Sequence, residues 1–191
     1  MTRTFVAVYP DTDARAALAA CLARLAADVP RGVRWIPPDQ AHLTLRFFGD
    51  LTDEAVTVAT RVVSSITAAR PPFTLAWGGL GAFPDWRRPR VIWIGAGTGG
   101  AELEALAADF DHGFHAAGLG RADRPFRSHL TLGRCRVGET LDPATIERLR
   151  SWPVDLPPSP VTVVRLMASR LERRGAAHHL LSDARLGEGA E

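Results

Sequence analysis

His42-Leu43-Thr44-Leu45 stands in the first half of the 191-residue sequence, and His129-Leu130-Thr131-Leu132 repeats it in the second half. Residues two apart in a β-strand lie on the same face, so the histidine and threonine of each copy face one way and the leucines face the other. Each copy therefore predicts a strand that buries its leucines and presents an imidazole beside a hydroxyl. The repeat indicates two related halves.

Short apolar and β-branched runs predict further strands, and apolar residues at helical spacing predict helices between them. The predicted strands cover residues 5–9, 41–49, 73–77, 90–94, 127–133, 161–169 and 178–181, the last turning back at Gly175. The predicted helices begin at Asp11 or Thr12, at Thr52 or Asp53, at Glu102 and at Asp142. The glycine- and proline-rich residues 78–89 are expected to connect two strands. Several strand pairs have only hairpin-length connections, which favours an α+β fold with antiparallel sheets over a doubly wound fold.

Composition is typical of a single globular domain. The chain is 46% hydrophobic and 23% charged, with a formal net charge of +2. No apolar run approaches the 18 residues that a membrane span needs, so no membrane association is expected. The first residues lack the apolar stretch of a secretory signal, which predicts a cytoplasmic location. We expect residues 1–186 to form one domain and residues 187–191 a flexible tail.

Cysteine and lysine usage exclude several kinds of site. Cys21 and Cys135 are too few for a disulfide scaffold or a four-thiolate zinc site, and both are expected to be free thiols. All 23 basic residues are arginine. The chain therefore has no lysine for a Schiff base or a Walker-type phosphate loop, and phosphate contacts must come from arginine, histidine, hydroxyls or backbone amides.

Two imidazoles that meet across one cleft suit the chemistry of a phosphodiester. One neutral imidazole can take a proton from the attacking oxygen while one imidazolium gives a proton to the departing oxygen. The hydroxyls of Thr44 and Thr131, with nearby arginines, can hold the non-bridging oxygens. Such a reaction of His42 and His129 needs no metal ion.

Other interpretations of these residues remain open. A single histidine on a half-buried strand is often structural, and the same groove could bind RNA or a nucleotide without catalysis. A metal-dependent hydrolase could use His42 and His129 together with Asp50 or Asp53. His112 and His115 have a metal-binding helical spacing but no further ligand at a standard spacing, which favours a solvated helix face.

Arginine and phenylalanine provide candidate RNA contacts. Three arginine clusters could guide an RNA backbone: residues 87–90, 121–127 and 134–136. Phe47 and Phe48 are predicted on opposite faces of their strand, so one can stack on a base while the other packs in the core.

Two longer stretches carry a resemblance to a known family. They are Trp35…Pro38…His42-Leu43-Thr44-Leu45-Arg46-Phe47-Phe48-Gly49 and Arg124-Pro125-Phe126-Arg127-Ser128-His129-Leu130-Thr131-Leu132. They resemble the two ordered His-x-Thr-x signatures of the two-histidine phosphoesterases. More narrowly, they are similar to the bacterial and archaeal RNA 2′,3′-cyclic phosphodiesterases, historically called 2′-5′ RNA ligases. Residues 5–9, 90–93 and 166–186 extend the resemblance over nearly the whole chain.

The resemblance implies a bilobal α+β fold in which two pseudo-symmetric antiparallel sheets, flanked by helices, carry the motifs into a central cleft. It implies cofactor-free opening of a 2′,3′-cyclic phosphate, on an RNA end or a small cyclic nucleotide, to a 2′-phosphate, with reversible 2′-5′ RNA ligation as a further activity. His42 would donate a proton to the leaving 3′ oxygen, and His129 would activate water. Thr44, Thr131 and Arg134 would bind the phosphate. A monomer is expected.

Two positions depart from the family pattern. Ser128 precedes the second histidine where the family often has proline, which changes local rigidity but not the chemistry. His178 stands where the family commonly has tyrosine after a C-terminal glycine. A substrate contact made by that tyrosine is therefore not carried over to this chain.

Overall fold

Two four-stranded antiparallel sheets form the centre of this computed structural model, which describes residues 1–172 and 175–187. The first sheet has the order β10-β9-β1-β3, with β1 (Thr2–Val8), β3 (Leu43–Leu51), β9 (Val163–Glu172) and β10 (Gly175–Arg185). The second has the order β2-β7-β6-β5, with β2 (Val33–Trp35), β5 (Trp77–Phe83), β6 (Val91–Ala96) and β7 (His129–Cys135). A small sheet pairs β4 (Phe73–Leu75) with β8 (Ser159–Val161). The two tetrapeptides therefore lie in different sheets.

In the part of the chain that the structure describes, four α-helices cover the sheets: α1 (Thr12–Asp28), α2 (Asp53–Ala68), α3 (Gly100–Ala116) and α4 (Pro143–Arg150). A 3₁₀ turn, η1 (Pro38–Gln40), precedes β3. Three helices begin at predicted caps, where the side chains of Asp11, Thr52 and Asp142 accept backbone N–H bonds of 3.0, 3.3 and 2.9 Å. A polar cap satisfies an N–H that the first helical turn leaves unpaired.

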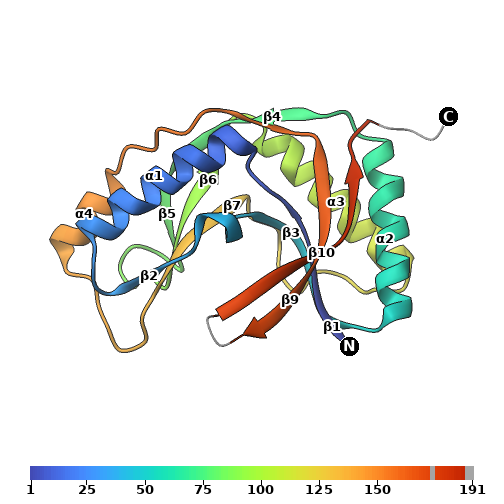
Figure 1. Cartoon of the computed structure of the whole chain (residues 1–191), viewed down its shortest axis with the longest axis horizontal. Coiled ribbons are helices and arrows are strands. Elements are labelled where there is room, and N and C mark those ends of the chain that lie inside the picture. Colours follow the sequence, from blue (N-terminus) through green and yellow to red (C-terminus); the bar gives the residue numbers. More distant parts are fainter. Residues whose placement is uncertain (173–174, 188–191) are drawn as a thin grey trace.

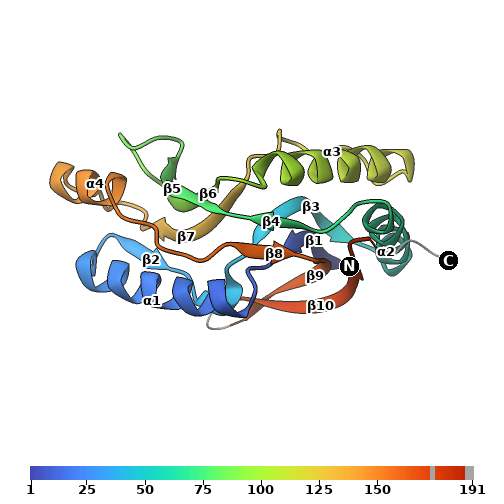
Figure 2. The same ribbon diagram turned by 90° about the horizontal axis from the view of Figure 1, so that it is seen from above.

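Apart from β2 and η1, which lie between α1 and β3, each half of the chain repeats one order of elements, β1-α1-β3-α2 and then β6-α3-β7-α4. The first helix of each repeat crosses to the sheet of the other repeat. Figures 1 and 2 show α1 and α4 with the second sheet at one end of the molecule, and α2 and α3 with the first sheet at the other end. The predicted bilobal α+β fold, with two pseudo-symmetric antiparallel sheets flanked by helices, is confirmed.

One hydrophobic core runs through both lobes. It joins Val6 of the first sheet and Ile92 of the second to Leu18 of α1 and Phe110 of α3. The leucines of both tetrapeptides belong to it: Leu43, Leu45, Leu130 and Leu132 are 1%, 5%, 0% and 0% exposed. The predicted alternation of buried leucines with cleft-facing polar residues is therefore confirmed.

Strand β5 contradicts the prediction that residues 78–89 only connect two strands. Gly81 of β5 pairs with Trp93 of β6, and a Cβ atom at position 81 would lie 2.2 Å from the Trp93 indole. A glycine inside a strand often marks such a close approach. This glycine therefore makes room for an indole rather than for a turn.

The membrane-spanning potential of the helices and the C-terminal part of the chain were both subjects of prediction. No helix in the described ranges is long and apolar enough to cross a membrane. Gly187, the first residue of the predicted tail, donates its N–H to the Thr67 carbonyl at 3.1 Å, and residues 188–191 lie outside the described residues. The turn predicted at Gly175 is placed wrongly, because Gly175 is the first residue of β10 and pairs with Glu172; residues 173–174 between the strands lie outside the described residues, and β9 and β10 pair antiparallel as expected.

Candidate active site

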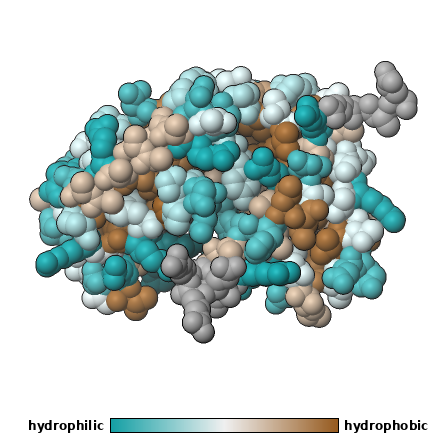
Figure 3. Space-filling model, viewed as in Figure 1, coloured by the Kyte–Doolittle hydropathy of each residue, from teal (hydrophilic) through white to brown (hydrophobic). Residues whose placement is uncertain are grey.

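A cleft of about 520 Å³ lies between the two sheets, where β3 and β7 meet. Figure 3 shows this face of the molecule, hollowed near its middle between hydrophilic side chains. All five residues that the sequence singled out line the cleft: His42, Thr44, His129, Thr131 and Arg134. The two copies of the repeat are therefore brought together in one place.

The His42 ring is held by a backbone hydrogen bond and by aromatic packing. Its Nδ1 lies 2.7 Å from the Gln40 carbonyl oxygen. A carbonyl can only accept, so Nδ1–H donates and Nε2 is the nitrogen left for a substrate. The ring stacks on Phe5 at 4.9 Å between centroids and lies 5.4 Å from the Tyr9 ring. Both the orientation and the tautomer of His42 are thereby fixed.

His129 has the same backbone setting in the other lobe. Its Nδ1 lies 2.7 Å from the Arg127 carbonyl oxygen, again two residues earlier in the chain. Nε2 is therefore the available nitrogen here too. Its ring packs edge-on against Phe83 at 4.9 Å and Trp93 at 6.2 Å. The pseudo-symmetry of the fold thus extends to the tautomers of the two imidazoles.

Burial lowers the pKa of both histidines. For His42 it lowers the pKa from 6.5 to about 4; the Gln40 carbonyl opposes the shift, and positive charge on His178 or His129 adds to it. Burial also lowers the pKa of His129, where the Arg127 carbonyl opposes the shift and the Arg134 cation adds to it. Both imidazoles are therefore mainly neutral at pH 7 in the protein by itself.

A β-bulge follows each histidine–threonine pair. The pairing register steps over Leu45 in β3 and over Leu132 in β7, in each case three residues after the histidine. The skipped leucine and the residue after it, Arg46 or Gly133, are buried on the side away from the cleft. An extra residue in one strand changes which face the following side chains reach. The bulge therefore returns the fifth residue after each histidine to the cleft.

Phe47 and Arg134 are those two residues, and both line the cleft. Phe47 is 47% exposed, with the Arg3 guanidinium 5.1 Å from its ring centroid. Phe48 points the other way and packs edge-on against Phe114 at 4.7 Å. The prediction that the two phenylalanines occupy opposite faces is confirmed, and Phe47 is the one available to a base.

Sequence reasoning missed Arg34, which also lines the cleft. It lies between Val33 and Trp35 on β2, and only Val33 and Trp35 carry an apolar signal. Alternation alone places Arg34 on the opposite face from its neighbours. Nothing in the sequence indicates that a three-residue strand pairs with β7, so the location of Arg34 could not be predicted. Among the three predicted arginine clusters, only Arg134 lines the cleft within the described residues.

The alternative metal site is not assembled in the described part of the chain. Asp50 and Asp53, its proposed carboxylates, are both exposed, and no three His, Cys, Asp or Glu side chains there gather closely enough to hold a metal ion. His112 and His115 are exposed on α3, as a solvated helix face requires. The set of ligands that a metal-dependent hydrolase would need is therefore not brought together.

Comparison with known proteins places this site in a family. Residues 8–93 match the model for LigT like Phosphoesterase. The chain is similar to the RNA 2′,3′-cyclic phosphodiesterase of Aquifex aeolicus, with 31% identity over 81% of this chain and 82% of that protein. The chain belongs to the LigT-like phosphoesterase family of RNA 2′,3′-cyclic phosphodiesterases. Two crystal structures of LigT-like phosphoesterases share its fold. TT0787 of Thermus thermophilus has a TM-score of 0.77 and 27% identity, and the match covers 99% of this chain and 100% of that one. E. coli LigT complexed with 3′-AMP has a TM-score of 0.76 and 25% identity, and the match covers 97% of this chain and 98% of that one.

Within this LigT-like phosphoesterase, His178 adds a third histidine to the cleft. Its ring packs edge-on against His42 at 5.1 Å and against Phe5 at 4.9 Å. Burial lowers the pKa of His178, while Asp39 opposes the shift and His179 adds to it. Its Nδ1 is buried without a hydrogen-bond partner among the described residues. His178 therefore contributes to the wall that holds His42.

Proposed function

We propose that this chain hydrolyses 2′,3′-cyclic phosphates at RNA ends to 2′-phosphates, with His42 and His129 as its two proton-transfer groups. The observation that carries the proposal is the matched pair of imidazoles in one cleft. Each donates Nδ1–H to the carbonyl two residues earlier and keeps Nε2 for the substrate. Such pre-set donors and acceptors are what general acid–base catalysis requires.

Each imidazole carries out one proton transfer. Nε2 of His129 accepts a proton from water as the water oxygen bonds to phosphorus. The bond between phosphorus and the 3′ oxygen breaks, and Nε2–H of His42 donates its proton to that oxygen. The product has a 2′-phosphate and a 3′-hydroxyl, and the two histidines return to their starting states by exchanging protons with solvent. When the 5′-hydroxyl of a second RNA takes the place of water, the same two proton transfers join that oxygen to phosphorus while the 3′ oxygen leaves, which is 2′-5′ ligation.

Thr44, Thr131 and Arg134 bind the phosphate in this scheme. The threonine hydroxyls lie beside the imidazoles in the cleft, and neither hydrogen-bonds another described residue. They can donate to the non-bridging oxygens, and the Arg134 guanidinium can offset the negative charge that develops there. Hydroxyls and a guanidinium of this kind supply the charge stabilisation of the reaction without a metal ion.

The donor role of His42 requires the substrate to raise its pKa. In the protein by itself burial lowers the pKa of His42 to about 4. A phosphate anion beside the ring favours the charged imidazolium and so raises the pKa. The proposal therefore predicts that binding inorganic phosphate moves the NMR titration of His42 toward neutral pH.

The decisive experiment measures hydrolysis of an oligonucleotide with a 2′,3′-cyclic phosphate, in EDTA, by wild type, His42→Ala and His129→Ala. Each substitution is expected to lower kcat by about 10²–10⁴-fold, because it removes one proton transfer. His112→Ala, on the exposed face of α3, serves as the matched control and should retain wild-type activity. Product analysis should show a 2′-phosphate, and circular dichroism checks that each variant folds.

Three outcomes would overturn the proposal. Full activity of either cleft variant would exclude its histidine from the reaction. Binding of the oligonucleotide without turnover would indicate a non-catalytic RNA-binding module. Loss of activity in EDTA would restore the metal-dependent alternative.

We further propose that residues 1–186 act as one bilobal domain, monomeric and cytoplasmic, on RNA ends or small cyclic nucleotides. One continuous core spans both lobes, and both histidines belong to one chain, which supports a monomeric unit. Cys21 and Cys135 form no disulfide, as is usual in a reducing compartment. Light scattering of the purified chain tests the monomer, because a dimeric mass at assay concentrations contradicts it.

A further inference from the structure

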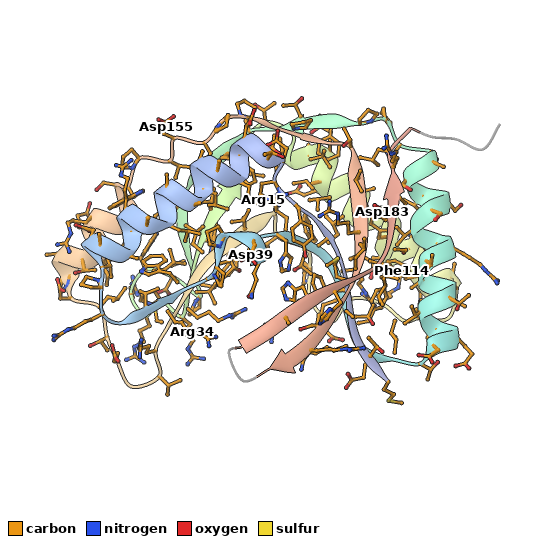
Figure 4. All side chains as sticks on the ribbon, in the orientation of Figure 1. Arg15, Arg34, Asp39, Phe114, Asp155 and Asp183 are labelled. Carbon is orange, nitrogen blue, oxygen red and sulfur yellow. The ribbon has the colours of Figure 1, made fainter. Side chains whose placement is uncertain are left out.

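Arg34 and Arg134 form a pair of like charges at the cleft. They are directly opposite each other in the antiparallel register of β2 and β7. Residues opposite each other in such a pair have Cβ atoms only about 4.5–5.5 Å apart. Both side chains are exposed and both line the cleft, and Figure 4 shows Arg34 on β2.

Two arginines in this position repel each other unless an anion lies between them. Like charges directly opposite on neighbouring strands destabilise a sheet. Neither arginine forms an ion pair with a carboxylate among the described residues, whereas Arg46, Arg70, Arg121, Arg148 and Arg150 each do. The pair is therefore a positive site that an anionic ligand would complete.

The location of Arg34 separates it from the reacting phosphate. Arg134 lies three residues beyond Thr131 with the bulge at Leu132 between them, so it is less than about 10 Å further along the strand at about 3.3 Å per residue. Arg34 lies one strand further out, since β2 is the edge of the second sheet. Arg34 therefore lies closer to the next phosphate of an RNA chain than to the phosphate held by the two imidazoles and the two threonines.

We propose that Arg34 binds a second phosphate of the substrate, with Arg134 between that phosphate and the reacting one, and this inference rests on the proposed function. A 2′,3′-cyclic phosphate ends an RNA chain, so any second phosphate lies on the 5′ side of the terminal nucleotide. Guanidinium groups match phosphate oxygens with two parallel hydrogen bonds, which makes paired arginines a strong phosphate site. The site selects oligonucleotide ends over cyclic mononucleotides.

The test compares three substrates in which the second phosphate is absent, charged or replaced by a neutral group. They are adenosine 2′,3′-cyclic phosphate, the dinucleotide ApA ending in a 2′,3′-cyclic phosphate, and the same dinucleotide with a neutral methylphosphonate linkage. The variants are Arg34→Gln, which removes the charge, and Arg34→Lys, which keeps it. Arg61→Gln, at an exposed position on α2, is the matched control for loss of one arginine.

Arg34→Gln is expected to lower kcat/KM about 10- to 100-fold for the charged dinucleotide, the usual effect of losing a charge-assisted hydrogen bond. It should change kcat/KM less than about twofold for the mononucleotide and the methylphosphonate, and Arg34→Lys should restore part of the loss. The slope of log kcat/KM against log salt should become shallower by about 0.7 for the charged dinucleotide, as expected for one phosphate contact fewer on a single strand.

Two results would overturn the second-phosphate site. An equal loss on all three substrates would place Arg34 at the reacting phosphate or in the fold, and no loss on any substrate would remove it from binding. Equilibrium binding separates this proposal from the proposed function. Arg34→Gln should weaken binding of ApA 2′-phosphate but not of 2′-AMP, even in a His129→Ala background that does not turn over. If wild type binds ApA 2′-phosphate through Arg34 but hydrolyses no cyclic phosphate, the second-phosphate site is supported and the proposed hydrolysis is contradicted.

Discussion

Lowering the pH from 7 to 5 is expected to destabilise the fold through the His42 imidazole. Its pKa is about 4 in the fold against 6.5 in the ordinary state, because burial disfavours the charged ring. Between these values the unfolded chain binds a proton and the folded chain does not. The part of the unfolding free energy that depends on a neutral His42 is therefore fully present above pH 6.5 and is lost as the pH falls toward 4. From these two values, His42 alone removes about 2 kcal/mol of unfolding free energy between pH 7 and pH 5.

Urea unfolding followed by tryptophan fluorescence measures this loss. Wild type and His42→Gln are compared at pH 7 and pH 5, because glutamine can still donate a hydrogen bond to the Gln40 carbonyl but does not titrate. His129 and His178 contribute with the same sign in both proteins, since burial lowers the pKa of each. On going from pH 7 to pH 5, wild type should therefore lose about 2 kcal/mol more unfolding free energy than His42→Gln, and this extra loss isolates the contribution of His42.

Parallel pH dependence in the two proteins would refute this reasoning, because it would mean that His42 binds protons equally in the folded and unfolded states. His112→Gln controls for the loss of a histidine outside the cleft. Inorganic phosphate provides a second check. A bound anion stabilises the imidazolium, so saturating phosphate should reduce the part of the pH dependence that His42 carries.

Three further substitutions are expected to change the unfolding free energy in the same assay at pH 7. Gly81→Ala should cost about 1–3 kcal/mol, because its methyl group would overlap the Trp93 indole; an unchanged midpoint contradicts the close packing. Arg46→Ala should cost about 3 kcal/mol, because the 5%-exposed guanidinium pairs with Asp111 at 2.8 Å, whereas Arg121→Ala, at the other oxygen of that carboxylate, should cost under 1 kcal/mol. Equal losses of unfolding free energy for Arg46→Ala and Arg121→Ala would show that burial does not strengthen the ion pair with Asp111. Asp142→Ala should cost about 1 kcal/mol by uncapping α4, and Asp142→Asn much less.

The parts of the fold that local chemistry determines could be predicted from the sequence. The alternation in the two tetrapeptides correctly buries Leu43 and Leu130, and polar caps such as Asp11 mark where helices begin. These signals act within one strand or one helical turn, so they do not depend on the rest of the molecule. The convergence of His42 and His129 followed from the repeat, because related halves tend to pack symmetrically.

The parts that depend on pairing between distant segments could not be predicted. Gly81 looks like a turn residue in the sequence, and only its register opposite Trp93 shows why a strand needs a glycine there. Arg34 joins the cleft only because β2 pairs with β7, across about half the chain. A β-bulge likewise leaves no local signal, so the return of Phe47 to the cleft face was not foreseen in detail.

We propose that neighbouring groups assign the roles of the two histidines, because the repeated tetrapeptide gives both rings the same backbone bond. Arg134 keeps a permanent positive charge beside His129 and disfavours an imidazolium there at any pH. Burial is the main cause of the lowered pKa of His42, and the charged groups that add to this shift are histidines, which are themselves mainly neutral at pH 7. When a phosphate anion lies between the two rings, it favours protonation of a nearby imidazole, and no permanent positive charge opposes that protonation at His42. We therefore infer that His42 is the donor and His129 the acceptor, and that exchanging them would require moving Arg134 to the other lobe.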